Sequence, residues 1–174
     1  HYYTYLEALG LTDINDSQRL QDLTKKGIYA MEGRPSNLPY EHCVEGWCVK
    51  EAIKFIDECQ DTPFCMHVSF PRPHQPYTPD KKFWYLYSET IELPETINRN
   101  PNGRSPLFEE CWADFKTNEG AYEPTGFENF AKRLWRGYLA CITQVDYALG
   151  ELLDHLKTTG RDNDTIVIYN ADHG

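Results

Sequence analysis

Three side chains in this sequence are of types that do acid–base or metal chemistry and lie where a site is expected. Asp172 and His173 are adjacent and follow directly on the apolar, β-branched run 165–169. His74 follows a second apolar run, 64–70, by a few residues. Such runs predict buried strands. Since ligands of open α/β sheets bind beyond the carboxyl ends of the strands, both placements favour a functional site.

Each of these residues also has a simpler explanation. A single loop histidine is usually just exposed, but prolines surround His74 and fix the direction in which it points. These prolines are Pro71, Pro73, Pro76 and Pro79. Asp172 could instead be a turn residue that accepts bonds from its own backbone. Arg72 is a candidate anion binder beside His74, although surface exposure is the stronger expectation. His67, inside the run 64–70, is expected to be a core histidine.

Helical periodicity surrounds the two apolar runs. Apolar residues at three- and four-residue steps predict a helix over 45–59 and a long helix over 127–159, with Gly160 at the C′ position. Shorter helices are predicted over 2–9, 15–27 and 80–87. A strand, a helical crossover and a second strand suggest a right-handed parallel pair. In that α/β arrangement the three candidate side chains converge on one rim of the sheet.

The least regular part of the sequence is 88–127, which carries many prolines and glycines. A long irregular insertion in a compact domain is usually functional or disordered. Its aromatic residues favour an ordered segment that lines the rim of a pocket.

The bulk composition excludes several classes of protein. The 174 residues suggest one domain, and the formal charge of −10 disfavours nucleic-acid binding. An anionic substrate remains compatible, because a metal can supply local positive charge. No apolar stretch is long enough to span a membrane. Four cysteines in or beside apolar segments are expected to be buried free thiols: Cys48, Cys59, Cys65 and Cys141. The chain begins at His1, which suggests an internal piece of a longer protein.

Four segments, in this order, resemble the sulfatase family. Residues 64–79 are similar to the family's strand that runs into a Pro-His-x-Pro-Tyr loop, and 82–87 to the aromatic run after it. Residues 138–150 resemble the helix before the last metal strand. Residues 164–174 resemble the family's Asp-Thr-hydrophobic strand ending in Asp-His-Gly. The resemblance covers most of residues 45 to 174.

The resemblance implies an α/β sandwich of the alkaline phosphatase superfamily, with helices on both faces of a mixed, mostly parallel sheet. It implies hydrolysis of sulfate esters or sulfamates with one Ca²⁺ ion. Asp172 matches a metal ligand, and His173 the neighbouring ligand, which is Asn in many members. His74 matches a histidine that contacts the sulfate and handles the leaving group. Since imidazole is a less natural calcium ligand than carboxylate, His173 either binds the metal or contacts the nucleophile or sulfate.

One departure from the family pattern is large. The nucleophile motif Cys/Ser-x-Pro-x-Arg, whose first residue becomes formylglycine, does not occur in these 174 residues. Residues 1–174 are therefore expected to be a partial catalytic domain that is inactive alone. The expected ligand is a sulfated small molecule or carbohydrate, and the resemblance favours a secreted, periplasmic or lysosomal location. The oligomeric state is left open.

Two alternatives compete with the sulfatase hypothesis. One is a phosphate or phosphonate ester hydrolase of the same superfamily, which would use two Zn²⁺ or Mn²⁺ ions and more histidine ligands. His173 in place of Asn keeps this alternative open. The other is a non-catalytic binding protein that kept the fold and binds sugar rings with its aromatic residues.

Overall fold

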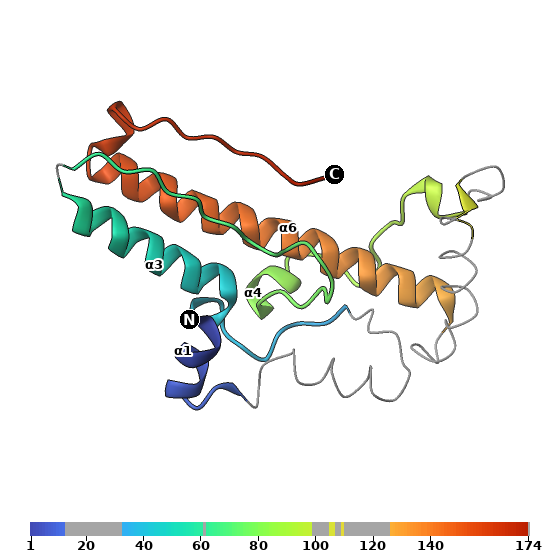
Figure 1. Cartoon of the computed structure of the whole chain (residues 1–174). Helices are drawn as coiled ribbons and strands as arrows, with labels where there is room; N and C mark the ends of the chain where they lie inside the picture. Colours follow the sequence, from blue (N-terminus) through green and yellow to red (C-terminus); the bar gives the residue numbers. More distant parts are fainter. Residues whose placement is uncertain (13–32, 61, 99–104, 107–108, 110–125, 174) are drawn as a thin grey trace.

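The computed structural model describes residues 1–12, 33–60, 62–98, 105–106, 109 and 126–173. Its frame is a pair of long helices that pack side by side (Figure 1), α3 (Val44–Cys59) and α6 (Phe127–Thr158). The shorter helices are α1 (Tyr2–Ala8), η2 (Tyr40–His42), α4 (Lys81–Trp84), η3 (Glu95–Asn98) and η4 (Arg161–Asn163). The predicted helices over 2–9, 45–59 and 127–159 are thereby confirmed, whereas the one predicted over 80–87 is shorter and spans only Lys81–Trp84. The one predicted over 15–27 lies outside the described residues.

The apolar periodicity of both long helices becomes the core. On α6 a stripe of side chains no more than 7% exposed faces inward, and it includes Phe130, Leu134, Cys141, Ala148, Leu152 and Leu156. On α3 the matching stripe is Val49, Ala52 and Ile56. Gly160, at φ 73°, takes the left-handed conformation that ends α6, as its predicted C′ position requires.

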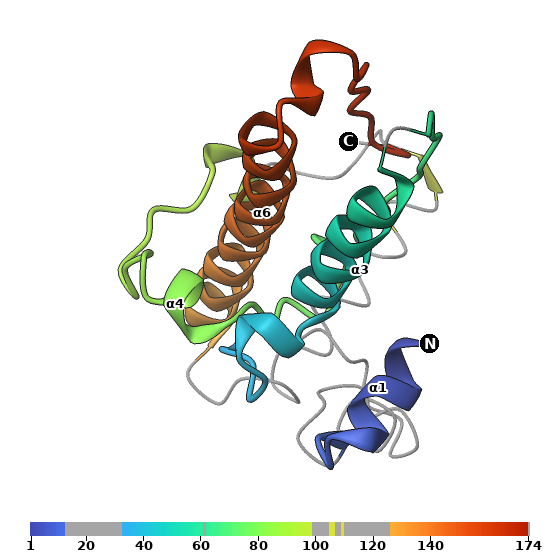
Figure 2. The ribbon, with the colours of Figure 1, turned by 90° about the vertical axis from the view of Figure 1, so that its left-hand side faces the viewer.

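Each long helix is followed by an extended segment that turns back along it. Figures 1 and 2 show α3 and α6 running in the same direction. Figure 1 also shows that 62–70 and 165–173 both return the opposite way and therefore run parallel to one another. Two helix-plus-extended units arranged in this way are the building blocks of an α/β fold.

The two extended segments differ from the predicted pair of buried strands. Among the described residues neither belongs to a sheet, and the structure shows an isolated parallel bridge between Gly33 and Tyr77. Segment 64–70 nevertheless alternates between covered and exposed side chains, which is the period of a strand with one buried face. Its covered residues Met66, Val68 and Phe70 pack against the core. On the opposite side, His67 is exposed, so its prediction as a core histidine is wrong.

Segment 165–169 is the larger exception, because its apolar side chains contact little. Ile166 is 90% exposed, Ile168 81% and Tyr169 72%. The prediction of a buried strand there is wrong for the part of the chain that the structure describes. An apolar run of this kind requires a covering partner, and the described part of the chain provides none for it.

The expectation that four cysteines are buried free thiols is confirmed only in part. Of the cysteines, Cys141 is buried, Cys48 and Cys59 are partly covered, and Cys65 is exposed, so burial holds fully only for Cys141 among these four. All four are free thiols. Much of the predicted insertion 88–127 lies outside the described residues. No helix in the described ranges is long and apolar enough to cross a membrane.

Candidate functional site

An open cleft of about 2610 Å³ lies between the 62–78 segment, one face of α6 and the 164–173 segment. His74, Asp172 and His173 all line it. The structure therefore brings the three candidate side chains to one cleft, although they come from positions about a hundred residues apart in the sequence. Their individual roles stay predictions.

His74 is exposed and its ring is oriented by its own loop. The backbone N–H of His74 donates to the Pro71 carbonyl at 3.1 Å, which closes a turn. Nδ1 of the imidazole lies 2.7 Å from the Gln75 carbonyl oxygen. A carbonyl oxygen only accepts, so Nδ1 carries a proton in this contact. Nε2 is then the nitrogen available to exchange a proton with a ligand.

Asp172 and His173 stand at the tip of the exposed segment, with side chains 89% and 81% exposed. The backbone N–H of His173 donates to Asp172 Oδ1 at 3.0 Å, and His173 Nε2 lies 3.7 Å from Asp172 Oδ2. The turn-type contact of the simpler explanation is thus present. Within the described residues no group of three His, Cys, Asp or Glu side chains could hold a metal. The Asp172 carboxylate suits a hard cation, but Ca²⁺ takes about six to eight oxygen ligands.

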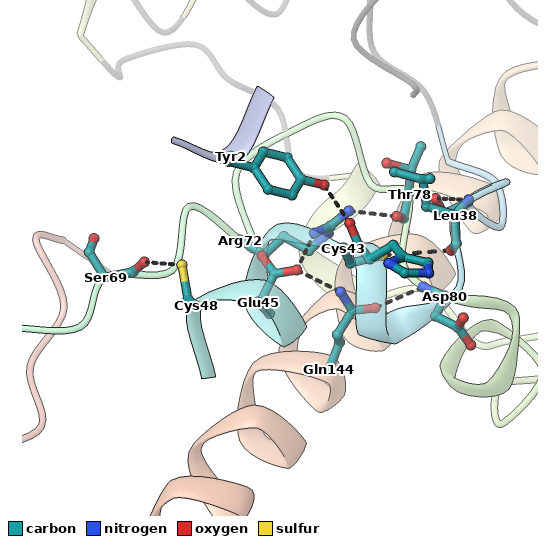
Figure 3. Close-up of polar contacts among 12 residues, drawn as sticks. Tyr2, Leu38, Cys43, Glu45, Cys48, Ser69, Arg72, Thr78, Asp80 and Gln144 are labelled. Atoms are coloured by element: carbon teal, nitrogen blue, oxygen red, sulfur yellow. Dashed lines mark hydrogen bonds and ion pairs between the residues drawn. The ribbon is translucent and has the colours of Figure 1, made fainter. Parts of the chain in front are cut away.

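The loop that carries His74 is anchored by a buried ion pair (Figure 3). Arg72 Nη1 pairs with Glu45 Oε2, and Arg72 Nη2 donates to the Thr78 carbonyl at 2.8 Å. The side chains of Arg72 and Glu45 are 13% and 0% exposed. The expectation that Arg72 is exposed is therefore wrong, and its role as an anion binder is disfavoured. Its charge is balanced from within the protein, because the start of α3 brings Glu45 under the loop.

Gln144 extends this network to α6. Its Nε2 donates to Glu45 Oε2 at 2.7 Å, and its Oε1 accepts from the backbone N–H of Asp80 at 2.7 Å. Gln144 is 0% exposed. The network thus joins α3, α6 and both ends of the loop, as Figure 3 shows.

Burial and charge act in opposite directions on the ionisable groups of this network. Burial works to lower the pKa of Arg72, but the neighbouring Glu45 carboxylate outweighs it and holds the pKa above its usual value. Burial raises the pKa of the Cys141 thiol to about 12, although the Arg72 charge partly opposes this. The guanidinium is therefore permanently charged, and Cys141 is a neutral thiol at ordinary pH.

Sequence reasoning missed Glu45 and Gln144, yet one signal for Glu45 was present. Glu45 shares the buried stripe of α3 with Val49, Ala52 and Ile56, at helical spacing. A carboxylate on an apolar stripe is rarely buried without a cationic partner. That partner, Arg72, lies 27 residues further along the chain, and only the fold identifies it.

The limb of the loop after His74 is fixed by backbone contacts and aromatic packing. Arg34 N–H donates to the Tyr77 carbonyl at 3.2 Å. The Tyr77 ring meets Tyr138 edge-on, with centroids 5.7 Å apart. Gly137 lets Tyr77 lie close to the backbone of α6. A Cβ at position 137 would lie 2.8 Å from Tyr77 Cβ and 2.9 Å from the Tyr77 carbonyl oxygen.

A histidine loop and an extended segment ending in Asp172 and His173 thus line one cleft beside two parallel helices. Comparison with known proteins identifies the family. A sequence profile described as Sulfatase matches residues 12–174. Choline-sulfatase of Rhizobium meliloti (strain 1021) is 31% identical over 124 residues, which cover 68% of this chain and 22% of that protein. This chain belongs to the sulfatase family.

Two further relatives show the breadth of the match. Human iduronate 2-sulfatase is 28% identical over 139 residues, covering 72% of this chain and 24% of that protein. The multifunctional alkaline phosphatase superfamily protein PehA of Trinickia caryophylli is 24% identical over 150 residues, covering 81% and 29%. The chain thus spans less than a third of each of these relatives. Family membership implies an alkaline-phosphatase-like α/β fold and a divalent metal.

Proposed function

We propose that these 174 residues are a partial catalytic domain of a hydrolase that cleaves sulfate esters. The proposal is supported by the presence of His74, Asp172 and His173 in the lining of one open cleft, in a chain of the sulfatase family. The nucleophile, a formylglycine made from Cys or Ser, and the other metal ligands would come from residues outside this chain. The sulfated ligand is a small molecule or a carbohydrate.

His74 is the proton donor in this proposal. Its Nδ1 contacts the Gln75 carbonyl oxygen, so Nε2 would be the nitrogen that gives a proton to the leaving group. As the nucleophile's oxygen bonds to sulfur, the S–O bond of the ester breaks and its electron pair goes to the leaving oxygen, to which Nε2 gives its proton. The product alcohol is neutral, and the ring becomes a neutral imidazole that can take a proton again.

Asp172 is a metal ligand in this proposal, and His173 either binds the same ion or contacts the nucleophile or sulfate. A single Ca²⁺, when bound, neutralises the sulfate oxygens and stabilises charge at the reacting centre. The Asp172 carboxylate supplies the oxygen ligand that a hard cation prefers. Its exposure leaves it open to the cleft.

We also propose that segments 64–70 and 165–169 are parallel strands of a mixed sheet with helices on both faces. Two observations support this: the alternating burial of 64–70 and the exposed apolar surface of 165–169. In the complete domain further strands would cover both segments and pair their backbone groups. Residues 88–127 would then lie at the rim of the cleft and act on substrate choice.

The test uses the complete protein that contains this chain. Sulfate release from aryl and sugar sulfates, with one bound Ca²⁺ per molecule, is the expected result. The complete sequence is expected to hold Cys/Ser-x-Pro-x-Arg before His1. Absence of that motif would remove the sulfatase proposal.

A second candidate function is phosphate or phosphonate ester hydrolysis. The match to the superfamily protein PehA and the imidazole of His173 favour it. It predicts two bound Zn²⁺ or Mn²⁺ ions and phosphate release in the same assays. The non-catalytic alternative predicts release of neither product, together with ligand binding that survives Asp172→Ala.

A further inference from the structure

The Glu45–Arg72 ion pair lies at the base of the His74 loop. It has no role in the proton transfer or the metal binding proposed above. Arg72 precedes His74 by two residues, and its guanidinium spans the base of the loop. One side of it contacts Glu45 on α3, and Nη2 reaches the Thr78 carbonyl on the opposite limb at 2.8 Å. The imidazole therefore stands on a loop whose two limbs are closed by one buried side chain.

The Arg72 side chain and its partners connect the loop to both long helices. Glu45 belongs to the first turn of α3, and Gln144 of α6 donates to the same Oε2 that Arg72 contacts. Gln144 in turn accepts from the backbone N–H of Asp80, where the loop ends. A displacement of Glu45 would consequently loosen Arg72 and Gln144 together.

Stability alone is a poor explanation for this pair. Within the described part of the chain, Glu45 Oε1 and Arg72 Nε are buried without a hydrogen-bond partner. A buried ion pair whose remaining polar atoms are unsatisfied is often no more stable than an apolar pair of the same volume. Its geometry is specific, however, because the planar guanidinium fixes the directions of the Glu45 and Thr78 contacts at once.

We propose that Glu45 is a positioning residue that acts through Arg72 to hold the His74 imidazole in its working orientation. The inference rests on the proposed function of His74 as proton donor. It adds a second set of residues, Glu45, Arg72 and Gln144, that never touch the substrate. It also assigns Arg72 to loop geometry and not to sulfate binding.

The test compares kcat, KM and thermal stability of the complete protein in Glu45→Gln, Arg72→Met and the double variant. Each single change is expected to lower kcat by about ten- to a hundredfold, as the loss of a group that orients a site residue does. KM is expected to change little, since neither side chain contacts the ligand. In the double variant thermal stability recovers, because no uncompensated buried charge remains, while kcat stays low. Full recovery of kcat together with stability would overturn the proposal.

Two controls distinguish a positioning role of Glu45 from a nonspecific loss of activity caused by destabilisation. Asp57→Asn removes the charge from another polar contact between α3 and α6, the 2.8 Å pair with His155, and is expected to leave kcat unchanged. In a His74→Ala background, Glu45→Gln is expected to cause no further loss of kcat. Losses that multiply in that background would show that Glu45 acts independently of His74 and would overturn the inference.

Amide hydrogen exchange tests the positioning role without any measurement of activity. If the unaltered protein releases no sulfate, the hydrolase proposal fails, and amide hydrogen exchange across residues 71–79 decides the positioning role. Glu45→Gln is expected to speed exchange there by about tenfold or more, whereas Asp57→Asn leaves it unchanged. Equal exchange rates in the two variants would contradict the inference.

Discussion

The two segments that bring side chains to the cleft are held in opposite ways. The loop 71–80 is tied to both long helices through Arg72, Glu45 and Gln144. The segment 164–173 follows α6 and η4 with its apolar side chains exposed, and at its tip the His173 backbone N–H donates to the neighbouring Asp172 carboxylate. The comparison teaches that the described residues hold the loop proposed to carry the proton donor. They leave the proposed metal half of the site, at 164–173, without a comparable support.

The largest expected effect tests the metal half. In the complete protein Asp172→Asn is expected to lower sulfate release on the order of a thousandfold, because a catalytic metal contributes several kcal/mol. Bound calcium is expected to fall in parallel, by elemental analysis. Asp164→Asn, a change of the same chemistry at the start of the same segment, is the control and should alter neither. Full activity in Asp172→Asn would exclude its role as a ligand.

The next effect tests whether 165–169 is covered in the complete domain. Ile168 is 81% exposed here, so as a surface residue its replacement by Asp would change stability by less than about 0.5 kcal/mol. Burial in a sheet predicts a loss of about 2–4 kcal/mol instead. Urea unfolding of the complete protein distinguishes these outcomes. Leu86→Asp is the control, since Leu86 is 66% exposed in the turn after α4.

A smaller effect tests the contact between Tyr77 of the loop and Gly137 of α6. Alanine there would place its Cβ 2.8 Å from Tyr77 Cβ, so unfolding stability is expected to fall by about 1–3 kcal/mol. Gly150 is a matched control on the same helix, because nothing lies within 4 Å of its Cβ position. Gly150→Ala is expected to raise stability by about 0.5–1 kcal/mol. A gain at Gly137 equal to the gain at Gly150 would mean that Tyr77 does not pack tightly on α6.

The smallest effect concerns alkaline pH and the buried thiol under the loop. Burial raises the pKa of Cys141 to about 12 in the folded protein, whereas an exposed thiol in the unfolded chain titrates near ~8.5. Between these values the folded state binds more protons, so stability falls as pH rises, by up to about 1.4 kcal/mol per pH unit. Urea midpoints at pH 8.5 and 9.5 measure the slope. Cys141→Ala is expected to flatten it, and an unchanged slope would contradict the prediction.

Local periodicity accounts for what could be predicted. The apolar spacing of 127–159 predicts α6, and Gly160 marks its end, because a helix is built from contacts three and four residues apart. The two extended segments and their common direction follow from composition and chain order. The resemblance of four segments to sulfatases is confirmed by the family match over 12–174.

The sequence by itself thus determined the helices, the family and the candidates His74, Asp172 and His173. Only the tertiary structure decided that Arg72 is buried and paired with Glu45, and that Gln144, 99 residues from Glu45, joins them. It also decided that 165–169 has no cover among the described residues. The physical reason is the range of the interactions. Helical periodicity is written in neighbouring residues, whereas an ion pair or a sheet contact depends on a partner that the chain brings near only by folding.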